Sequence, residues 1–231
     1  METELSEQRR IIAVGDVHGC ISTLKTLIGR IRPGGDDQFV FLGDLIDRGN
    51  YSKEVIDYLL EFRSACSCHF IMGNHEWLFL DCIENRDPVK WFVNGGQETL
   101  ASYDVRDPAD IPAEHLEFIH SFRYFIETPD FFFTHGGLDP ELSVRDNLRY
   151  YKPEELCWQR VHMRTTFLES RNYKWEKTVV CAHTPIAEPV VQEKLIAIDT
   201  GCVYRENPLL GSLSAVILPE REIVQVENCE E

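Results

Sequence analysis

Five short apolar runs recur along the chain, and each one stops abruptly at polar residues. They occupy residues 11–14, 39–42, 69–72, 130–133 and 179–182. Apolar runs with little or no polar interruption suit strands that are covered on both faces. The sequence therefore predicts a series of buried strands with a polar loop at the end of each.

A helix is predicted after each of the first two runs, because apolar residues there have helical spacing. In the first helix these residues are Leu24, Leu27, Ile28 and Ile31, and Pro33-Gly34-Gly35 ends the helix. In the second helix they are Val55, Ile56, Leu59 and Leu60. Because strands alternate with helices in this order, the pattern predicts an α/β fold.

The pattern changes between residues 76 and 129. An apolar helix is predicted to start at residues 77–80, and residues 114–122 are also helical in spacing, whereas clear strands are missing over 88–129. The strand pattern then resumes at Asp130. We therefore interpret 88–129 as a helical insertion or cap that borders the site, within a single domain over residues 1–231.

The last third of the chain gives weaker signals. Residues 150–177 are predicted to be helical or irregular, with a helix start at 153–155. Three apolar segments at 195–201, 212–218 and 222–227 then predict an antiparallel edge, whose last two strands join at Pro219-Glu220.

The polar residues that follow the five runs share one chemistry. Polar loops at the carboxyl ends of parallel strands gather at one rim of a sheet, where ligands bind. Oxygen and nitrogen ligands of this kind suit Mn, Fe or Zn better than Ca or thiolate-bound Zn. The candidate ligands are Asp16, His18, Asp44, Asn74, His135 and His183.

Asp44 stands at the centre of this prediction. Asp44, Asp47 and Arg48 crowd between two glycines, which is unfavourable unless metal, phosphate or hydrogen-bond partners satisfy the charges. We interpret Asp44 as a ligand shared by two metal ions. Asp16 and His18 would point the same way if the strand continued through Asp16. Taken alone, however, this pair is more typical of a turn aspartate and a surface histidine than of a metal site.

Three motifs in this order carry a family resemblance: GDVHG at 15–19, GDLIDRG at 43–49 and GNHE at 73–76. With His135 and His183 after them, they resemble the phosphoprotein phosphatase family of the calcineurin-like metallophosphoesterases. Residues 91–103 look most like the bacterial and bacteriophage serine/threonine phosphatases. The resemblance implies a four-layer α/β sandwich of two mixed sheets flanked by helices, with a dinuclear metal centre.

The resemblance also implies a role for each matching residue. Asp16, His18 and Asp44 would hold one ion, and Asp44 would bridge to a second ion held by Asn74, His135 and His183. His75 would be the general acid, oriented by Asp47. The implied substrate-binding residues are Arg48, Asn74 and, from the short match at 157–160, Arg160. Ala182 stands where the family usually has glycine.

The leading functional prediction is a metal-dependent serine/threonine protein phosphatase in which a metal-bridging hydroxide attacks the phosphomonoester directly. The motifs of covalent phosphatases, C-x5-R, D-x-D and G-K-[ST], do not occur. One alternative is a symmetrical dinucleoside tetraphosphate hydrolase. Those enzymes usually lack an acidic residue at the position of Asp47 and read GNHD, so Asp47 and Glu76 favour the phosphatase. The other alternative is an inactive scaffold with the same fold.

Composition narrows the partners and the compartment. The formal net charge is -16, which argues against nucleic acid or an anionic membrane surface as a partner. The resemblance implies phosphorylated proteins or peptides as substrates. Residues 1–10 lack the apolar stretch of a signal peptide, so we expect a cytoplasmic protein with its eight cysteines reduced. Manganese is the expected metal, with Fe or Zn as alternatives.

Overall fold

The computed structural model describes residues 5–231 and contains two five-stranded sheets. The first sheet has the order β10-β9-β1-β2-β3. Its strands are β1 (Ile11–Val14), β2 (Gln38–Phe41), β3 (Ser67–Phe70), β9 (Ser212–Leu218) and β10 (Glu222–Glu227). β1, β2 and β3 run parallel, whereas β9 is antiparallel to both β1 and β10. The first sheet is therefore mixed.

The second sheet has the order β4-β5-β6-β8-β7 and is mixed in the same way. Its strands are β4 (Phe125–Glu127), β5 (Phe131–Thr134), β6 (Thr178–Cys181), β7 (Val190–Val191) and β8 (Leu195–Ala197). β5, β6 and β8 are parallel, and the antiparallel strands β4 and β7 form the edges. All five apolar runs predicted as strands lie in these parallel sets.

Apolar side chains from the two sheets meet in a central core. Ile11 and Val40 of the first sheet belong to the same buried cluster as Phe133 and Val180 of the second. The alternate residues of the same strands face outward and pack against helices. Every strand face in the centre is thus covered, which explains why these runs have few polar residues.

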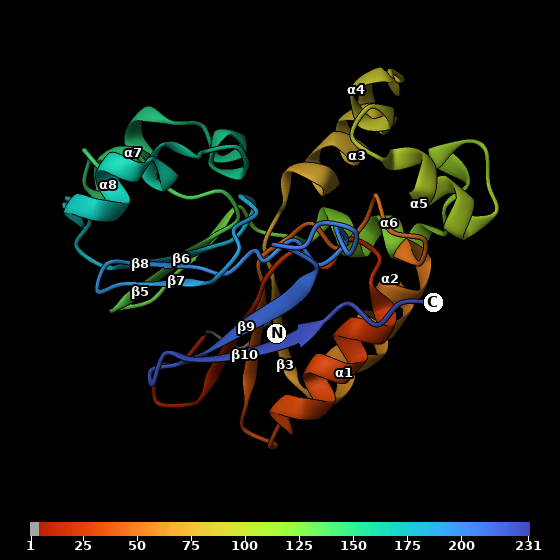
Figure 1. The fold of residues 1–231 in the computed structure, drawn as a ribbon. Coiled ribbons are helices and arrows are strands. Elements are labelled where there is room, and N and C mark those ends of the chain that lie inside the picture. The colour runs from red at the N-terminus through yellow and green to blue at the C-terminus, as the bar shows by residue number, and fades with distance from the viewer. Residues whose placement is uncertain (1–4) are drawn as a thin grey trace.

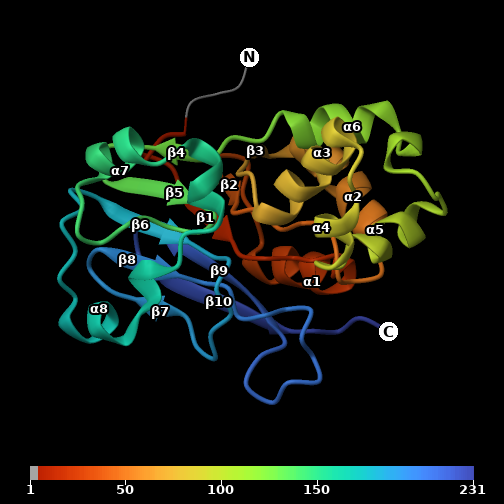
Figure 2. The same ribbon diagram turned by 90° about the horizontal axis from the view of Figure 1, so that it is seen from above.

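Helices cover the outer faces of both sheets, as Figures 1 and 2 show. The first sheet carries α1 (Ile21–Ile31) and α2 (Ser52–Ala65), while α7 (Val144–Tyr150) and α8 (Thr165–Ser170) lie over the second. Short 3-10 helices occupy Pro153–Cys157 and Val161–Met163. The predicted sandwich of two mixed sheets flanked by helices is confirmed.

The segment after β3 is mainly helical. It contains α3 (Asn74–Asn85), α4 (Val89–Phe92), α5 (Gly96–Tyr103), a 3-10 turn at Pro108–Asp110 and α6 (Ala113–His120). The prediction of a strand-free cap over 88–129 was wrong at its end, because Phe125–Glu127 forms β4 and pairs with β5. None of the helices within residues 5–231 is both long and apolar enough to cross a membrane.

The predicted C-terminal edge was also partly wrong. Residues 212–218 and 222–227 form the expected antiparallel hairpin, β9 and β10. Residues 195–197, however, form β8, which lies in the other sheet and runs parallel to β6. Apolar pattern alone could not separate these strands, because both sheets bury both faces.

Candidate metal centre

The six predicted ligands come together at the loops that follow the parallel strands. All are buried, with exposed side-chain fractions between 0 and 4%. They are Asp16 and His18 after β1, Asp44 after β2, Asn74 at the start of α3, His135 after β5 and His183 after β6. Because the strands that precede these loops run parallel within each sheet, their loops meet at the same end of the sheets.

Asp44 links two tight clusters of possible ligands. One contains His18, Asp44 and His75, the other Asp44, His135 and His183, and within each cluster the ligand atoms lie within 4.8 Å of one another. The Asp44 Oδ2 atom is 3.6 Å from His18 Nε2 and 3.3 Å from His135 Nε2. Asp44 therefore belongs to both groups of possible metal ligands.

Backbone carbonyls orient two of the histidines. His18 Nδ1 lies 2.8 Å from the Ile46 carbonyl, and His135 Nδ1 lies 2.7 Å from the Leu42 carbonyl. A carbonyl only accepts hydrogen bonds, so each Nδ1 carries a proton and each Nε2 is left to face the centre. His135 Nε2 is there 3.0 Å from Asn74 Oδ1 and 3.1 Å from His183 Nδ1.

His135 and Asp44 shift each other's pKa. Burial alone would lower the pKa of His135, but the Asp44 and Glu76 carboxylates and the Leu42 carbonyl together outweigh burial and raise that pKa. Burial would likewise raise the pKa of Asp44, yet the His135 and His75 imidazoles hold it well below its usual range. A buried carboxylate, an amide oxygen and imidazole nitrogens are a donor set that fits divalent metal ions.

Asp16 and His18 are predicted to point the same way if the strand continues through Asp16. In the structure β1 ends at Val14 and His18 has a left-handed φ of 45°, so the strand does not continue through these residues. The Asp16 Oδ1 atom instead accepts a hydrogen bond from His183 N at 3.3 Å and lies 3.8 Å from His135 Nδ1. Asp16 therefore borders the second cluster, and its assignment to the first ion stays a prediction.

Asp199 is a buried carboxylate at this centre that the motifs did not reveal. It follows β8, is 2% exposed, and accepts a hydrogen bond from Gly201 N at 2.9 Å. Burial raises its pKa to about 6. Burial and the Asp199 charge together raise the pKa of Asp16 well above its usual range. The signal was present, since Asp199 also ends an apolar run, but that run was assigned to the wrong sheet.

His75 is held by a fully buried aspartate. Its Nδ1 lies 2.8 Å from Asp47 Oδ2, while its Nε2 is buried without a hydrogen-bond partner in residues 5–231, 3.9 Å from Asp44 Oδ2. Trp91 Nε1 donates to both Asp47 oxygens at 3.0 and 2.9 Å, and Thr99 Oγ1 donates to Oδ1 at 2.6 Å. The cap thus contacts the site through α4 and α5.

Glu76 stabilises the turn that carries Asp44. Its two oxygens accept hydrogen bonds from Gly73 N, Asp44 N and Leu45 N at 3.1, 2.8 and 2.7 Å. The turns approach so closely that a Cβ atom on Gly73 would lie 2.2 Å from Asp44 Oδ1. Glu76 therefore binds backbone rather than facing the cluster, so its difference from aspartate is weak evidence about the substrate.

One arginine lies at each end of the cluster. Arg48 NH1 is 2.7 Å from His18 Nε2, and Arg160 Nε donates to His183 Nε2 at 2.8 Å. Each end also has a partly exposed aromatic ring. Tyr204 lies 5.7 Å from the Arg48 guanidinium carbon, and the Trp158 ring lies 6.1 Å from the His183 ring.

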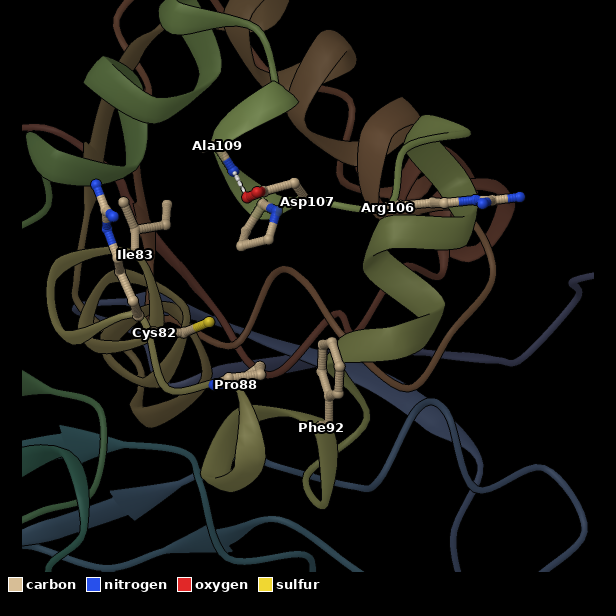
Figure 3. Close-up of a pocket in the computed structure, with 9 residues that line it drawn as sticks. Cys82, Ile83, Pro88, Phe92, Arg106, Asp107 and Ala109 are labelled. Carbon is tan, nitrogen blue, oxygen red and sulfur yellow. Dashed lines mark hydrogen bonds between the residues drawn. The ribbon is translucent and has the colours of Figure 1, made fainter.

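A larger pocket of about 650 Å³ lies away from this centre (Figure 3). It is lined by Cys82, Ile83 and Arg86 at the far end of α3, together with Phe92 and residues 106–109. At a rise of about 1.5 Å per residue, Arg86 is about 16 Å along the helix from His75. Arg106 points away from the cavity in Figure 3. None of the candidate metal ligands lines this pocket, so it is separate from the centre.

The family model for calcineurin-like phosphoesterases matches residues 9–209. The chain belongs to the calcineurin-like phosphoesterases. This confirms the family resemblance and shows that the coarse activity is phosphoester hydrolysis at a divalent metal centre. The family does not by itself identify the metal.

Within the calcineurin-like phosphoesterases, several relatives are similar to this chain. The asymmetrical bis(5'-nucleosyl)-tetraphosphatase PrpE of Oceanobacillus iheyensis is 25% identical, over 95% of this chain and 92% of its own length. Serine/threonine-protein phosphatase 2 of Salmonella typhimurium is 40% identical, but over only 38% of this chain and 39% of its own length. A crystal structure provisionally assigned as a diadenosine tetraphosphatase has a TM-score of 0.72 at 23% identity, covering 99% of this chain and 97% of its own, which supports the fold.

Proposed function

We propose that this calcineurin-like phosphoesterase hydrolyses dinucleoside tetraphosphates. The observation that carries the proposal is the similarity to a bis(5'-nucleosyl)-tetraphosphatase along nearly the full length of both chains. The similarity to a serine/threonine phosphatase covers little more than a third of the chain. The proposal therefore replaces the leading prediction from sequence by its dinucleotide alternative.

The layout of the centre supports a ligand that extends on both sides. Arg48 and Arg160 contact histidines of different clusters, so phosphate oxygens could be bound at both ends. Guanidinium groups suit this role because they donate two parallel hydrogen bonds to phosphate. Tyr204 and Trp158, 36% and 40% exposed, offer one aromatic ring beside Arg48 and one beside His183. A dinucleoside tetraphosphate has a nucleoside at each end of its phosphate chain, so its two ends match the two ends of the centre.

The ligands of the centre have a defined task in this proposal. Asp16, His18, Asp44, Asn74, His135 and His183 would hold two divalent ions, with Asp44 between them. When bound, the ions would neutralise phosphate charge and lower the pKa of a bound water to near neutrality. Asn74 adds an oxygen ligand without a further negative charge, which limits repulsion of the anionic substrate.

His75 would act through its Nε2 atom. Asp47 accepts the Nδ1 proton and stabilises the charged ring, so Nε2 can hold a proton close to the centre. A serine or threonine alkoxide is strongly basic and needs such a donor. A departing nucleotide has a terminal phosphate with a pKa of about 6 and needs it much less.

The buried Asp47–His75 pair therefore favours a second candidate function, hydrolysis of phosphoserine or phosphothreonine in proteins. Asp47 has three side-chain donors and no exposed surface, so the position of Asp47 against His75 is fixed by its surroundings. The two functions make opposite predictions for a competition between their substrates.

The test uses metal-stripped protein refilled with Mn²⁺. Diadenosine tetraphosphate and a phosphothreonine peptide are supplied together at equal concentrations, so that the ratio of initial rates gives the ratio of kcat/KM values. The proposal predicts faster consumption of the dinucleotide. Faster consumption of the peptide would refute it and favour the protein phosphatase. The products, AMP with ATP or two molecules of ADP, identify the phosphorus that is attacked.

A further inference from the structure

A second, smaller pocket adjoins the metal centre at Arg48. It measures about 400 Å³ and lies between the turn that joins α4 to α5 and the loop after β8. Val93, Asn94 and Glu98 line one side, and Val203 and Tyr204 line the other. This volume lies within the range of about 300–1,000 Å³ that small-molecule sites occupy.

Arg48 connects this pocket directly to the centre. Its guanidinium group is 2.7 Å from His18 Nε2, and its Cζ atom is 5.7 Å from the centroid of the Tyr204 ring. The backbone is tied in as well, since Arg48 N donates to the Gly95 carbonyl at 3.1 Å. A molecule in the pocket would thus extend past Arg48 to the histidine at one end of the cluster.

The approach of the α4–α5 turn to Arg48 requires a glycine. Gly95 has a φ of 98°, and a Cβ atom there would lie 2.8 Å from Arg48 Cγ and 3.0 Å from Arg48 N. Larger residues would therefore separate the turn from Arg48. The wall of the pocket and Arg48 are thus held in close contact.

The charges of the lining side chains differ along the pocket. Arg48 lies at the end next to the metal centre and suits a phosphate. The Glu98 carboxylate lines the pocket and, within the part of the chain that the structure describes, takes part in no hydrogen bond or ion pair. It would repel a second phosphate but accept hydrogen bonds from hydroxyl or amino groups.

The remaining walls offer apolar and aromatic surface. Val93 is 78% exposed and Tyr204 is 36% exposed, so both present surface that a flat ring could cover. Stacking of bases on aromatic side chains is a general mode of nucleotide binding. The cation–π contact already places the Tyr204 ring beside the Arg48 guanidinium group.

We infer that this pocket binds one nucleoside of the substrate, with its base stacked on Tyr204, its polar groups donating to Glu98 and its 5'-phosphate on Arg48. The inference rests on the proposed function, because it assigns a place to one end of a dinucleoside tetraphosphate. It makes Tyr204 and Glu98 specificity-determining residues of the same site.

The test compares the binding of AMP with that of ribose 5-phosphate to the Mn²⁺-loaded protein by calorimetry. These probes carry the same phosphate on the same sugar position and differ in the base. The inference predicts that AMP binds more tightly. In Tyr204→Ala this preference should fall by about 5- to 150-fold, the range that loss of one base–aromatic stack covers.

Tyr204→Phe is the matched control, because it keeps the ring and removes only the hydroxyl group. It should retain the preference for AMP. Taking the ratio of the two affinities removes any loss that both probes share through a displaced Arg48. Equal binding of the two probes to the unaltered protein, or an unchanged ratio in Tyr204→Ala, would overturn the inference.

A phosphopeptide is the competing occupant, since Glu98 could pair with a basic residue beside the phosphothreonine. If the pocket binds a nucleoside, Glu98→Gln should weaken the binding of AMP. If Glu98→Gln weakens only the binding of an arginine-containing phosphothreonine peptide, the nucleoside assignment is wrong. Calorimetry needs no turnover, so it separates the two proposals. A base preference that depends on Tyr204 without hydrolysis of diadenosine tetraphosphate would support the pocket and refute the proposed function.

Discussion

Replacing Thr99 by valine tests how the cap supports the centre. Thr99 is 1% exposed, and its hydroxyl group donates to Asp47 Oδ1 at 2.6 Å while accepting from Asp47 N at 3.0 Å. Valine has nearly the same shape, so Thr99→Val removes the hydroxyl without creating a cavity. The Asp47 carboxylate then keeps only His75 and Trp91 as side-chain donors.

The expected loss follows from the kind of hydrogen bond that is removed. Hydrogen bonds to charged groups contribute about 1.5–3 kcal/mol, and a buried acceptor that loses its donor costs a similar amount. The Asp47 amide N–H still donates to Ser52 Oγ at 3.0 Å, so the loss of Thr99 as its second acceptor adds no further cost in free energy. We expect the free energy of unfolding to fall by about 2–3 kcal/mol.

Urea unfolding of the metal-stripped protein at pH 7 measures this loss. Thr99→Ser is the matched control: it keeps the hydroxyl and loses one methyl group, which should cost about 1 kcal/mol. Thr99→Val should also slow hydrolysis of a phosphothreonine peptide more than that of para-nitrophenyl phosphate, because Asp47 then orients His75 less well. Equal destabilisation by valine and serine would show that the Thr99 hydroxyl group does not stabilise the Asp47 carboxylate.

Three further predictions concern the centre and its surroundings. His75→Asn should slow release of a basic alkoxide far more than release of para-nitrophenolate, and an equal loss on both would exclude His75 as the acid. Asp44→Asn should deplete both metal ions together, so metal analysis that finds one fully occupied site would contradict a shared ligand. Burial lowers the pKa of His162 to about 3, so as pH falls from 7 to 5 the unfolded chain gains a proton that the folded chain does not. That difference destabilises the fold by about 2 kcal/mol; His162→Gln should reduce the pH-dependent loss by this amount, and an unchanged loss would show that His162 is not its source.

The ligand cluster could be predicted because its residues lie directly after apolar runs. Each run is local, and the rule that parallel strands end at a common rim needs no knowledge of distant contacts. The grouping of Asp44, His135 and His183 seen in the structure could therefore be predicted from the sequence.

Asp199 was missing from the predicted site because the strand before it, 195–197, was predicted to belong to the C-terminal antiparallel edge. Which sheet an apolar run joins depends on long-range packing, and β8 pairs with β6 rather than with the neighbouring hairpin. The same limit applies to Asp47, whose donors Trp91 and Thr99 are 44 and 52 residues away in sequence. Motif spacing showed that Asp47 and Glu76 matter, but it could not show that one supports His75 and the other supports a turn.

The prediction of a phosphoprotein substrate relied on Asp47 and Glu76 as discriminating residues. In the structure neither one faces a substrate. Glu76 binds backbone amides of the Asp44 turn, and Asp47 is fully buried behind His75. Residues that face outward, such as Tyr204 and Glu98, are better placed to determine which phosphoester is bound.

Anomalous X-ray diffraction from crystals of the Mn²⁺-loaded protein, collected on both sides of the manganese absorption edge, would show whether Asp44 bridges two ions. We expect two manganese peaks that share Asp44, one beside His18 and the other beside His135 and His183. A single peak, or two peaks that do not share Asp44, would show that this is not a dinuclear centre bridged by Asp44.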